Sequence, residues 1–212
     1  MPSTPDDPPR EIDLAAAAGT IGGLPVAPGD HICAFYRGTA ERDSLILPFL
    51  REGVRAGHKC ICITSPTDHA RIASTVLAGP GPVPGRLQLE DFDTTYLRSG
   101  SFLGEEMLAY WQEWAEQTFD REGWEFARGV TDMSWAESIV AEPAFNDFLS
   151  YELRATRLAR SYPQVALCLY DLDRFGGNVI IPVMKVHPKV LFGGILVDNP
   201  YFLEPDDALA GG

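Results

Sequence analysis

Short apolar runs alternate with amphipathic segments along most of the chain. The stretch from His31 to Ser65 shows this most clearly, because an apolar run at 31–36 is followed by a polar turn, an amphipathic segment that ends at Gly57, and a second apolar run. This order predicts a strand, a turn, a helix and a strand. In a parallel sheet the turn after the first strand lies at the ligand-binding edge, beside a helix N-terminus, so we expect function there.

The same alternation continues toward the end of the chain. Strands that alternate with helices predict an α/β fold, with a doubly wound, mainly parallel sheet and helices on both faces. The predicted strands cover 31–36, 59–64, 86–91, 126–135 with an exit loop, and 164–171. The predicted helices cover 40–56, 66–77, 101–119 and 144–160. A helix or loop at 179–184 precedes a terminal strand or hairpin at 189–197. The side chains of the first helix that are expected to face the sheet are Leu45, Leu47, Phe49, Leu50 and Val54.

Length and charge limit the classes of function. The chain has 212 residues, which suits a single domain, and we place that domain at 31–205, between a flexible arm at 1–30 and a flexible tail at 206–212. The formal net charge of −13 argues against nucleic acid or an anionic membrane as a direct partner. No apolar stretch reaches the ~18 residues of a membrane span and no signal peptide is present, so a cytoplasmic location is expected.

All four cysteines fall within apolar runs, so we expect buried, reduced thiols and no disulfide framework. His31 and Cys33 lie two positions apart on a strand and therefore face the same side, and Cys168 on a neighbouring strand could come within reach. Zinc accepts such ligands, but the sequence offers no fourth partner, so a metal is not expected. Trp111 and Trp114 stand at helical spacing, which is typical of a helix packed in a core.

The turn at 38–43 resembles the P-loop of RecA-like ATPases, and most closely that of the KaiC branch. The glycines that would wrap phosphates are mostly absent, Glu41 and Asp43 place negative charge where a triphosphate would lie, and Arg42 replaces the lysine. The resemblance implies a RecA-like three-layer sandwich with a degenerate P-loop that has lost ATP hydrolysis, without catalytic residues. Binding of ATP without turnover is an alternative, supported by Arg42 and by Asp132 at the position of the Walker B acid.

Several short segments match one family pattern in order and at suitable spacing. They are HICAFY at 31–36, PFLREGVRAGHKCICI at 48–63, RGVTDMSW at 128–135, YE at 151–152, LCLYDLDRF at 167–175, HP at 187–188 and NPYF at 199–202. Together they resemble the MEDS domain, a prokaryotic sensory domain named after methanogens, methylotrophs and a dichloromethane-responsive regulator. The resemblance implies a sensor of small hydrocarbon derivatives that is coupled to kinase, anti-sigma or DNA-binding output domains. Because no such domain is found in this sequence, we expect either that a separate partner protein reads its signal or that the sequence is a piece of a longer protein.

Polar and aromatic side chains at strand ends predict a ligand site. Asp132 ends one strand and Asp171 ends the next, with the first strand expected between them. A pocket with two carboxylates, an arginine and three aromatic rings suits a small, partly apolar ligand with one polar group. Alternatively, the two aspartates cap the following helices and pair with Arg37, Arg42 or Arg128. The residues expected to converge on this rim are Tyr36, Arg37, Asp132, Trp135, Tyr170 and Asp171.

Further side chains are candidates for ligand contact. His31 and Cys33 are favoured at the family level, although they lie toward the amino end of their strand. Glu152 and Glu137 could form a carboxylate pair, but no nucleophile or base accompanies them, and ion pairing explains them equally well. His187 precedes a proline and either forms a turn or lines the pocket. The full candidate set is His31, Cys33, Tyr36, Arg37, Arg42, Asp132, Trp135, Glu152, Tyr170, Asp171 and His187.

The leading hypothesis is a non-enzymatic sensory module that binds a small organic ligand and signals through a partner such as a histidine kinase, an anti-sigma factor or a transcription regulator. The degenerate P-loop together with intact polar residues at the strand ends favours this hypothesis. A nucleotide binder without hydrolysis is one alternative. Another is a ligand-free interaction protein that uses its acidic surface and self-associates into a homo-oligomer, as RecA-like folds often do.

Overall fold

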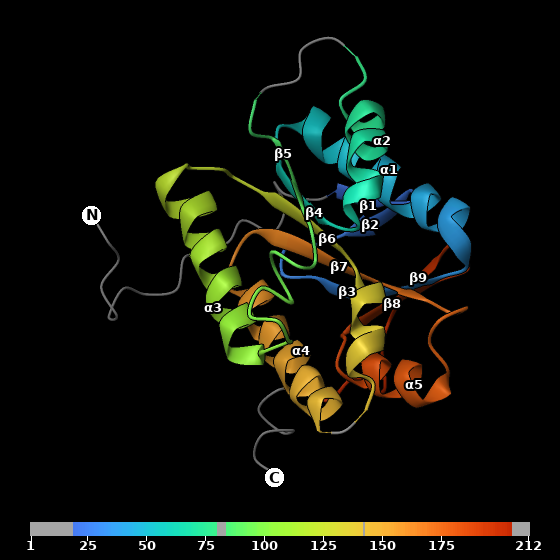
Figure 1. The fold of residues 1–212 in the computed structure, drawn as a ribbon. Helices are drawn as coiled ribbons and strands as arrows, with labels where there is room; N and C mark the ends of the chain where they lie inside the picture. Colours follow the sequence, from blue (N-terminus) through green and yellow to red (C-terminus); the bar gives the residue numbers. More distant parts are fainter. Residues whose placement is uncertain (1–18, 80–83, 142, 205–212) are drawn as a thin grey trace.

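The computed structural model describes residues 19–79, 84–141 and 143–204, which form a three-layer α/β structure (Figure 1). Its central sheet contains β3 (His31–Tyr36), β4 (Lys59–Ile63), β5 (Leu87–Glu90), β6 (Ala127–Asp132), β7 (Gln164–Asp171), β8 (Lys189–Phe192) and β9 (Ile195–Asp198). The strands stand in the order β5-β4-β6-β7-β3-β8-β9. Neighbouring strands run parallel, except that β8 and β9 are antiparallel. This sheet confirms the predicted fold class.

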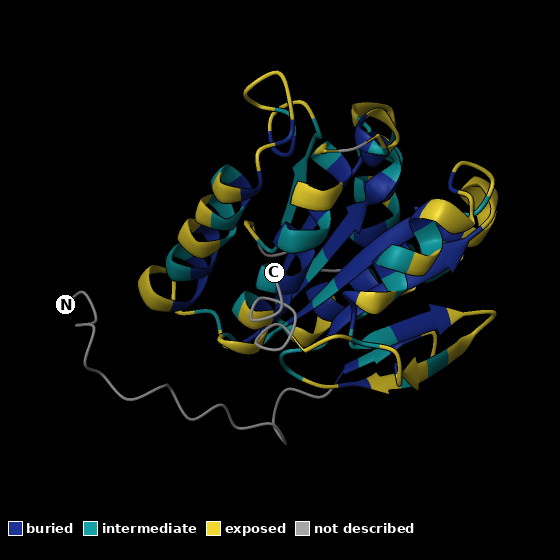
Figure 2. Ribbon diagram, turned by 90° about the horizontal axis from the view of Figure 1, so that it is seen from below, coloured by how far each residue is buried: buried dark blue, intermediate teal, exposed yellow. Residues whose placement is uncertain are grey.

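Helices cover both faces of the sheet. One face carries α1 (Gly38–Ala56) and α2 (Pro66–Val76), and the other carries α3 (Gly104–Ala115), the π-helical η1 (Glu116–Arg121), the 3-10 helix η2 (Met133–Ile139), α4 (Ala144–Arg160) and α5 (Gly177–Lys185). The buried side chains accordingly form two clusters, one on each face. Figure 2 shows buried strands in the middle of the molecule and exposed residues on the outer sides of the helices. Across the described ranges, every helix is too short or too polar to cross a bilayer.

The central strand β3 is buried along its whole length because helices lie on both sides of it. Its side chains alternate between the two clusters. Cys33 and Phe35 pack toward α3, α4 and α5, whereas Ile32 and Ala34 pack toward α1 and α2. The alternation places His31 on the same face as Cys33, as the sequence predicts.

Two predicted segments differ in detail from the observed ones. The helix predicted at 101–119 is α3 followed by η1, because the backbone after Ala115 widens so that the Glu122 N–H donates to the Gln117 carbonyl five residues earlier. The segment predicted at 179–184 is the helix α5, and the terminal segment is the β8–β9 hairpin.

The buried stripe of α1 agrees with the prediction at Phe49, Leu50 and Val54, but its first turns differ from the predicted ones. Ile46, Phe49, Leu50 and Val54 are buried, whereas Leu45 and Leu47 are only partly buried. The reason is the helical period, since positions 42, 46, 49, 50 and 53 share one face. Arg42 consequently lies on the buried stripe, where a charged residue needs a partner.

Residues 19–26 form a hairpin, although the sequence places them in a flexible arm. β1 (Gly19–Ile21) pairs with β2 (Leu24–Val26), and Ile21 and Val26 are buried against the α1 side of the core. Glu52 on α1 holds the hairpin, because its carboxylate accepts hydrogen bonds from Thr20 N at 3.0 Å and Thr20 Oγ1 at 2.6 Å. The rest of the predicted arm, 1–18, and the predicted tail, 206–212, lie outside the described residues.

The strand order also differs from the expected one. The first strand, β3, does not lie between β6 and β7, because these two strands pair directly with each other and β3 pairs with the other edge of β7. Apolar runs mark strands without specifying their neighbours, so the sequence could not settle this order. The observed order places Asp132 and Asp171 at the ends of adjacent strands.

Candidate functional site

The predicted rim contains a closed network of ion pairs around Asp132. Arg42 Nη1 donates to Asp132 Oδ2 at 2.8 Å, and Tyr36 OH donates to Oδ1 at 3.3 Å. Arg42 Nη2 lies 2.9 Å from Asp68 Oδ2 and 3.3 Å from Asp43 Oδ1. Burial and the neighbouring Asp132 raise the pKa of Tyr36 above its ordinary value. The Arg42 guanidinium, which replaces the P-loop lysine, is therefore neutralised by the protein's own carboxylates.

Other predicted rim residues point elsewhere. Arg37 is exposed and pairs with Asp173, while Asp171 accepts a hydrogen bond from the Asp173 backbone N–H. Trp135 lies on the opposite side, where its ring stacks on Tyr96 at a centroid distance of 4.5 Å. The Asp132 side chain also accepts from Ser134 N and so caps η2. These contacts fit the alternative in which the aspartates cap the next element and pair with arginine.

A second group of predicted residues converges in the interior, on the face covered by α3, α4 and α5. His31 begins β3, Glu152 lies on α4, and His187 follows α5. Glu152 Oε2 is 3.4 Å from the Nε2 atoms of both histidines. Cys168 of β7 completes the group, with Sγ 3.4 Å from His31 Nε2. The four side chains are hereafter called the His-Glu-Cys-His cluster; each is at most 7% exposed.

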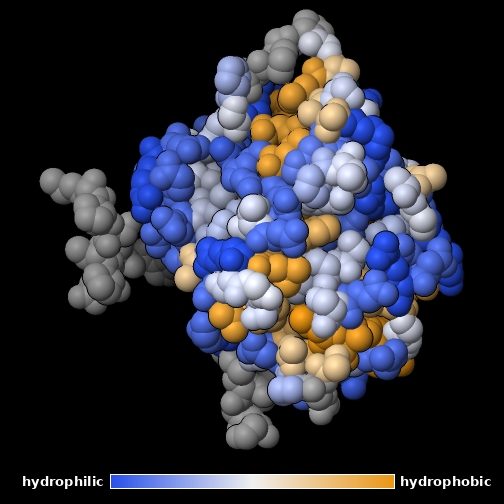
Figure 3. Space-filling model, in the orientation of Figure 1, coloured by the Kyte–Doolittle hydropathy of each residue, from blue (hydrophilic) through white to orange (hydrophobic). Residues whose placement is uncertain are grey.

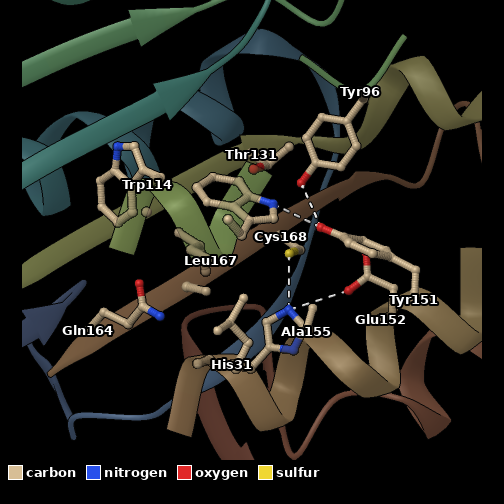
Figure 4. A pocket seen from close by; sticks show the side chains of 15 residues that line it. His31, Tyr96, Trp114, Thr131, Tyr151, Glu152, Ala155, Gln164, Leu167 and Cys168 are labelled. Atoms are coloured by element: carbon tan, nitrogen blue, oxygen red, sulfur yellow. Dashed lines mark hydrogen bonds and ion pairs between the residues drawn. The ribbon is translucent and has the colours of Figure 1, made fainter. Parts of the chain in front are cut away.

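The sheet register brings Cys168 to this cluster, whereas its register partner Cys33 makes a different contact. His31 pairs with Ala166 across the parallel β3–β7 ladder, so Cys168 lies two residues further along β7 on the same face. Figure 4 shows the His31 ring pointing at both Cys168 and Glu152. Cys33 instead donates to the Lys189 carbonyl at 3.7 Å. The sequence suggests that Cys168 lies within reach of His31, but it contains no signal that connects either residue to Glu152 or His187.

Hydrogen bonds fix the orientation of both imidazole rings. His187 Nδ1 lies 2.9 Å from the Val183 carbonyl oxygen, which can only accept, so Nδ1 carries the proton. His31 Nδ1 lies 2.8 Å from Thr156 Oγ1, whose own hydrogen is directed at the carbonyl of Glu152 or Val186. Thr156 therefore accepts from His31. Both Nε2 atoms consequently present lone pairs to the interior of the cluster.

Burial determines the protonation of the cluster. It raises the pKa of Glu152 to about 8 and lowers that of His187 to about 4. Burial, together with the neighbouring His187, lowers the pKa of His31 well below its ordinary value. Burial likewise raises the pKa of the Cys168 thiol well above its ordinary value. Near neutral pH the uncharged forms of all four groups are therefore favoured.

A cavity of about 50 Å³ adjoins this cluster, between α3, α4 and the sheet. His31, Glu152 and Cys168 form its polar wall. Its remaining wall is rich in aromatic rings (Figure 4). Trp111 Nε1 donates to Tyr151 OH at 2.9 Å, which fixes two of these rings. The aromatic residues that line it are Tyr96, Trp111, Trp114 and Tyr151.

Sequence reasoning missed these aromatic residues as candidates. Trp111 and Trp114 stand at helical spacing and were expected to be core, and Trp114 does pack in the core while also lining the cavity. No local pattern distinguishes a core ring from one that borders a cavity. Tyr170 and Trp135, which were candidates, are buried on this same face, but they do not line the cavity.

Known proteins resemble this chain in fold and in sequence. The chain is similar to a KaiC-like protein from Pyrococcus horikoshii OT3, with a TM-score of 0.51, 10% identity, and coverage of 81% of this chain and 74% of that one. It is also similar to the flagellar accessory protein FlaH from Methanocaldococcus jannaschii, with a TM-score of 0.50, 11% identity, and coverage of 90% and 82%. These likenesses support the RecA-like fold.

A sequence relative and a family model identify the family. The transcriptional repressor DcmR from Methylorubrum extorquens is 29% identical in an alignment of 188 positions that covers 81% of this chain and 63% of that protein, so the chain spans less than two thirds of its relative. The model of the methanogen/methylotroph, DcmR sensory domain matches residues 30–188. The chain therefore belongs to the MEDS family of sensory domains.

Proposed function

We propose that this protein is a regulatory sensory module whose cavity beside α3 and α4 binds a small organic molecule. The observation that carries the proposal is the cavity itself, which combines an aromatic wall with a polar wall formed by His31 and Glu152. Apolar pockets with a few convergent polar groups are the usual form of small-molecule sites. Membership of a sensory-domain family supports the same role.

The size of the cavity supports a ligand from the class of small hydrocarbon derivatives. A single water needs roughly 10–15 Å³ of such space, so about 50 Å³ suits a molecule of only a few non-hydrogen atoms. The aromatic rings would contact the carbon or halogen part of the ligand. The Glu152 carboxyl group, which is favoured in its protonated form, would donate a hydrogen bond to an oxygen. Short alcohols, aldehydes and halocarbons fit this description.

The arrangement of charges argues against a nucleotide at the degenerate P-loop. A triphosphate would have to displace carboxylates that already neutralise Arg42, including Asp132 at 2.8 Å. Asp43 would remain close to the phosphates and repel them. This supports the sensory role over the nucleotide-binding alternative.

The proposed output is regulatory and non-enzymatic. DcmR is named a transcriptional repressor, which supports signalling to a transcription regulator or a related partner, and a cytoplasmic location. Cys168 is poorly suited to nucleophilic catalysis, since burial keeps its thiol protonated. Ligand binding would act by favouring one conformation that the partner recognises.

A thermal-shift scan tests this function. We expect a short alcohol, aldehyde or halocarbon to raise the melting temperature of the purified full chain, because a ligand that binds only the folded form stabilises it. Ala155→Leu, which adds carbon atoms to the cavity wall, should abolish the shift, whereas the rim variant Asp132→Asn should retain it. Loss of the shift in Asp132→Asn alone would move the site to the rim. A shift with ATP and with no organic compound would support the nucleotide binder instead.

A further inference from the structure

The His-Glu-Cys-His cluster brings together four donor groups of three kinds from four separate parts of the chain. One ligand atom from each of His31, Glu152, Cys168 and His187 lies within 4.8 Å of the others. We propose that these four side chains bind one divalent metal ion, with zinc as the ion that best matches the donor set. With a metal bound, Glu152 would be ionised and would coordinate the ion instead of donating a hydrogen bond to an organic ligand, and the aromatic wall of the adjacent cavity would remain available to that ligand.

The distances agree with a tetrahedral site. Bonds of about 2.0–2.3 Å from zinc to nitrogen, oxygen and sulfur place neighbouring ligand atoms roughly 3.3–3.8 Å apart. Three pairs in the cluster already stand at 3.4 Å, namely His31 Nε2 with Glu152 Oε2, His187 Nε2 with Glu152 Oε2, and His31 Nε2 with Cys168 Sγ. Only small side-chain adjustments would complete the tetrahedron.

Several buried polar atoms in the cluster lack a partner that a metal would provide. Both carboxylate oxygens of Glu152, and Nε2 of His187, are buried and accept or donate no hydrogen bond with good geometry. Glu152 is 1% exposed and His187 is 0% exposed, so bulk water does not compensate. Unsatisfied buried polar groups of this kind are destabilising, and their convergence on one point indicates a missing common partner.

The outer contacts of the histidines are those of metal ligands. A metal-binding imidazole usually donates its other ring N–H to a carbonyl, a carboxylate or a hydroxyl group, which fixes the lone pair toward the metal. His187 Nδ1 has this contact with the Val183 carbonyl at 2.9 Å, and His31 Nδ1 has it with Thr156 Oγ1 at 2.8 Å. These contacts leave the Nε2 atom of each ring facing the other members of the cluster.

Charge and donor type select the ion. One carboxylate and one thiolate would balance a divalent cation, so that the buried complex would carry no net charge. Two imidazoles, a thiolate and a carboxylate suit zinc and its neighbours in the first transition series, whereas magnesium and calcium prefer oxygen ligands alone. In the competing arrangement the cluster holds protons instead, with the Glu152 carboxyl donating to His187 and the Cys168 thiol donating to His31.

Cobalt substitution distinguishes metal from protons. The purified full chain is first treated with a chelator, which is then removed, and Co²⁺ is added stepwise. We expect one equivalent to produce the visible bands of tetrahedral cobalt and a near-ultraviolet thiolate-to-cobalt band, and Zn²⁺ to displace it. Competition with a chromophoric chelator then measures the zinc affinity. Absence of both bands in the wild-type chain, or stoichiometry well above one, would overturn the proposal.

Matched variants assign the ligands. Cys168→Ala should lose the near-ultraviolet band, whereas Cys33→Ala, which removes the thiol of its register partner on β3, should keep it. His187→Gln should weaken zinc binding by about tenfold or more, and it serves as the decisive variant if Cys168→Ala fails to fold by circular dichroism. Retention of the band in Cys168→Ala, or unchanged zinc affinity in His187→Gln, would contradict the assignment.

Discussion

At the carboxyl end of β6, Asp132 accepts hydrogen bonds from Arg42, Tyr36 and the backbone of Ser134. A carboxylate at this position would orient a magnesium ion in an active ATPase, whereas here it serves the fold. The arginine that replaces the P-loop lysine reaches back to it and also to Asp68. The residues at the positions of a RecA-like P-loop and Walker B acid thus form an ion-pair network within this protein.

Removal of Asp132 should destabilise the protein. Asp132→Ala leaves a buried arginine with only its Asp68 and Asp43 partners, and a buried charge that loses a partner is costly. We expect a loss of about 2 kcal/mol in the free energy of unfolding, measured by urea denaturation.

The control for this variant is Asp173→Ala. Asp173 pairs with Arg37 on the surface, where an ion pair contributes about 0–1 kcal/mol. Equal losses of unfolding free energy in the two variants would show that the Asp132 network contributes no more stability than a surface ion pair.

Helix α1 approaches β6 and β4 closely at Gly53. A Cβ atom at this position would lie 2.7 Å from both Arg128 Cδ and Cys60 Sγ. The absence of a side chain lets the Arg128 guanidinium lie over the Phe49 ring, with its Cζ 4.9 Å from the ring centroid. Arg128 then reaches Glu52, which holds the β1–β2 hairpin. The close approach of α1 to the sheet at Gly53 therefore helps to position the β1–β2 hairpin.

Gly53→Ala should be destabilising even though alanine favours helices by about 1 kcal/mol relative to glycine. Overpacking against Arg128 and Cys60 is expected to cost about 1–3 kcal/mol, which leaves a net loss of stability in chemical denaturation. Gly177→Ala at the start of α5 is the control, because its Cβ would have its nearest neighbour at 3.9 Å. A gain of stability in both variants would mean that α1 can shift away from the sheet.

The hairpin contact should also depend on pH. Burial opposes ionisation of Glu52, but hydrogen bonds from Arg128 and Thr20 outweigh it and lower the pKa of the carboxyl below its ordinary 4.5. The folded protein therefore favours the charged carboxylate, and this stabilisation is present above the unfolded pKa and is lost as pH falls through the folded pKa.

Glu52→Gln should consequently be less stable than the wild-type chain near neutral pH, and the difference in stability should shrink as pH falls below the ordinary pKa of 4.5 and through the lower pKa of the folded state. Denaturant titrations across this range measure it. Glu137→Gln removes one charge of an exposed ion pair with Arg174, and its stability should differ little from that of the wild-type chain at any pH. A Glu52→Gln difference that stays constant in acid would argue against the ionised contact.

The whole molecule is organised as two apolar clusters on opposite faces of one sheet. Strands such as β3 and β7 contribute to both clusters, so neither face can lose its packing without disturbing the other. In Figure 3 polar side chains cover much of the visible surface, and apolar side chains gather near α5, where Ile181 is 59% exposed. The described part of the chain is expected to unfold as one unit.

Equilibrium unfolding should accordingly show coincident transitions for two probes. Tryptophan fluorescence reports on the face that contains Trp114 and Trp135, whereas far-ultraviolet circular dichroism reports on the helices of both faces. Matching midpoints in urea are expected for the full chain. An earlier fluorescence transition would indicate that the α3–α4 face opens separately.

The fold was largely predictable, and the site only in part. Hydrophobic periodicity alone located β3, β7 and α4, because burial on one or both faces imposes those patterns. The rim prediction failed to separate Tyr36 from Tyr170, since a position at a strand end does not specify which face the side chain takes. Glu152 and His187 were recognised as candidates, but their proximity to His31 depends on how α4 and α5 pack, which no local pattern records.

His187 lies on the short connection between α5 and the edge hairpin β8–β9. Five residues after it, Phe192 is 55% exposed, and on β9 Ile195 is 65% exposed. β8 also pairs directly with β3, the strand that carries His31. The two imidazoles are thus carried by segments that are joined through the β3–β8 ladder. The His-Glu-Cys-His cluster in the interior of this sensory domain is therefore joined, through a short stretch of chain, to a β8–β9 hairpin that exposes apolar side chains.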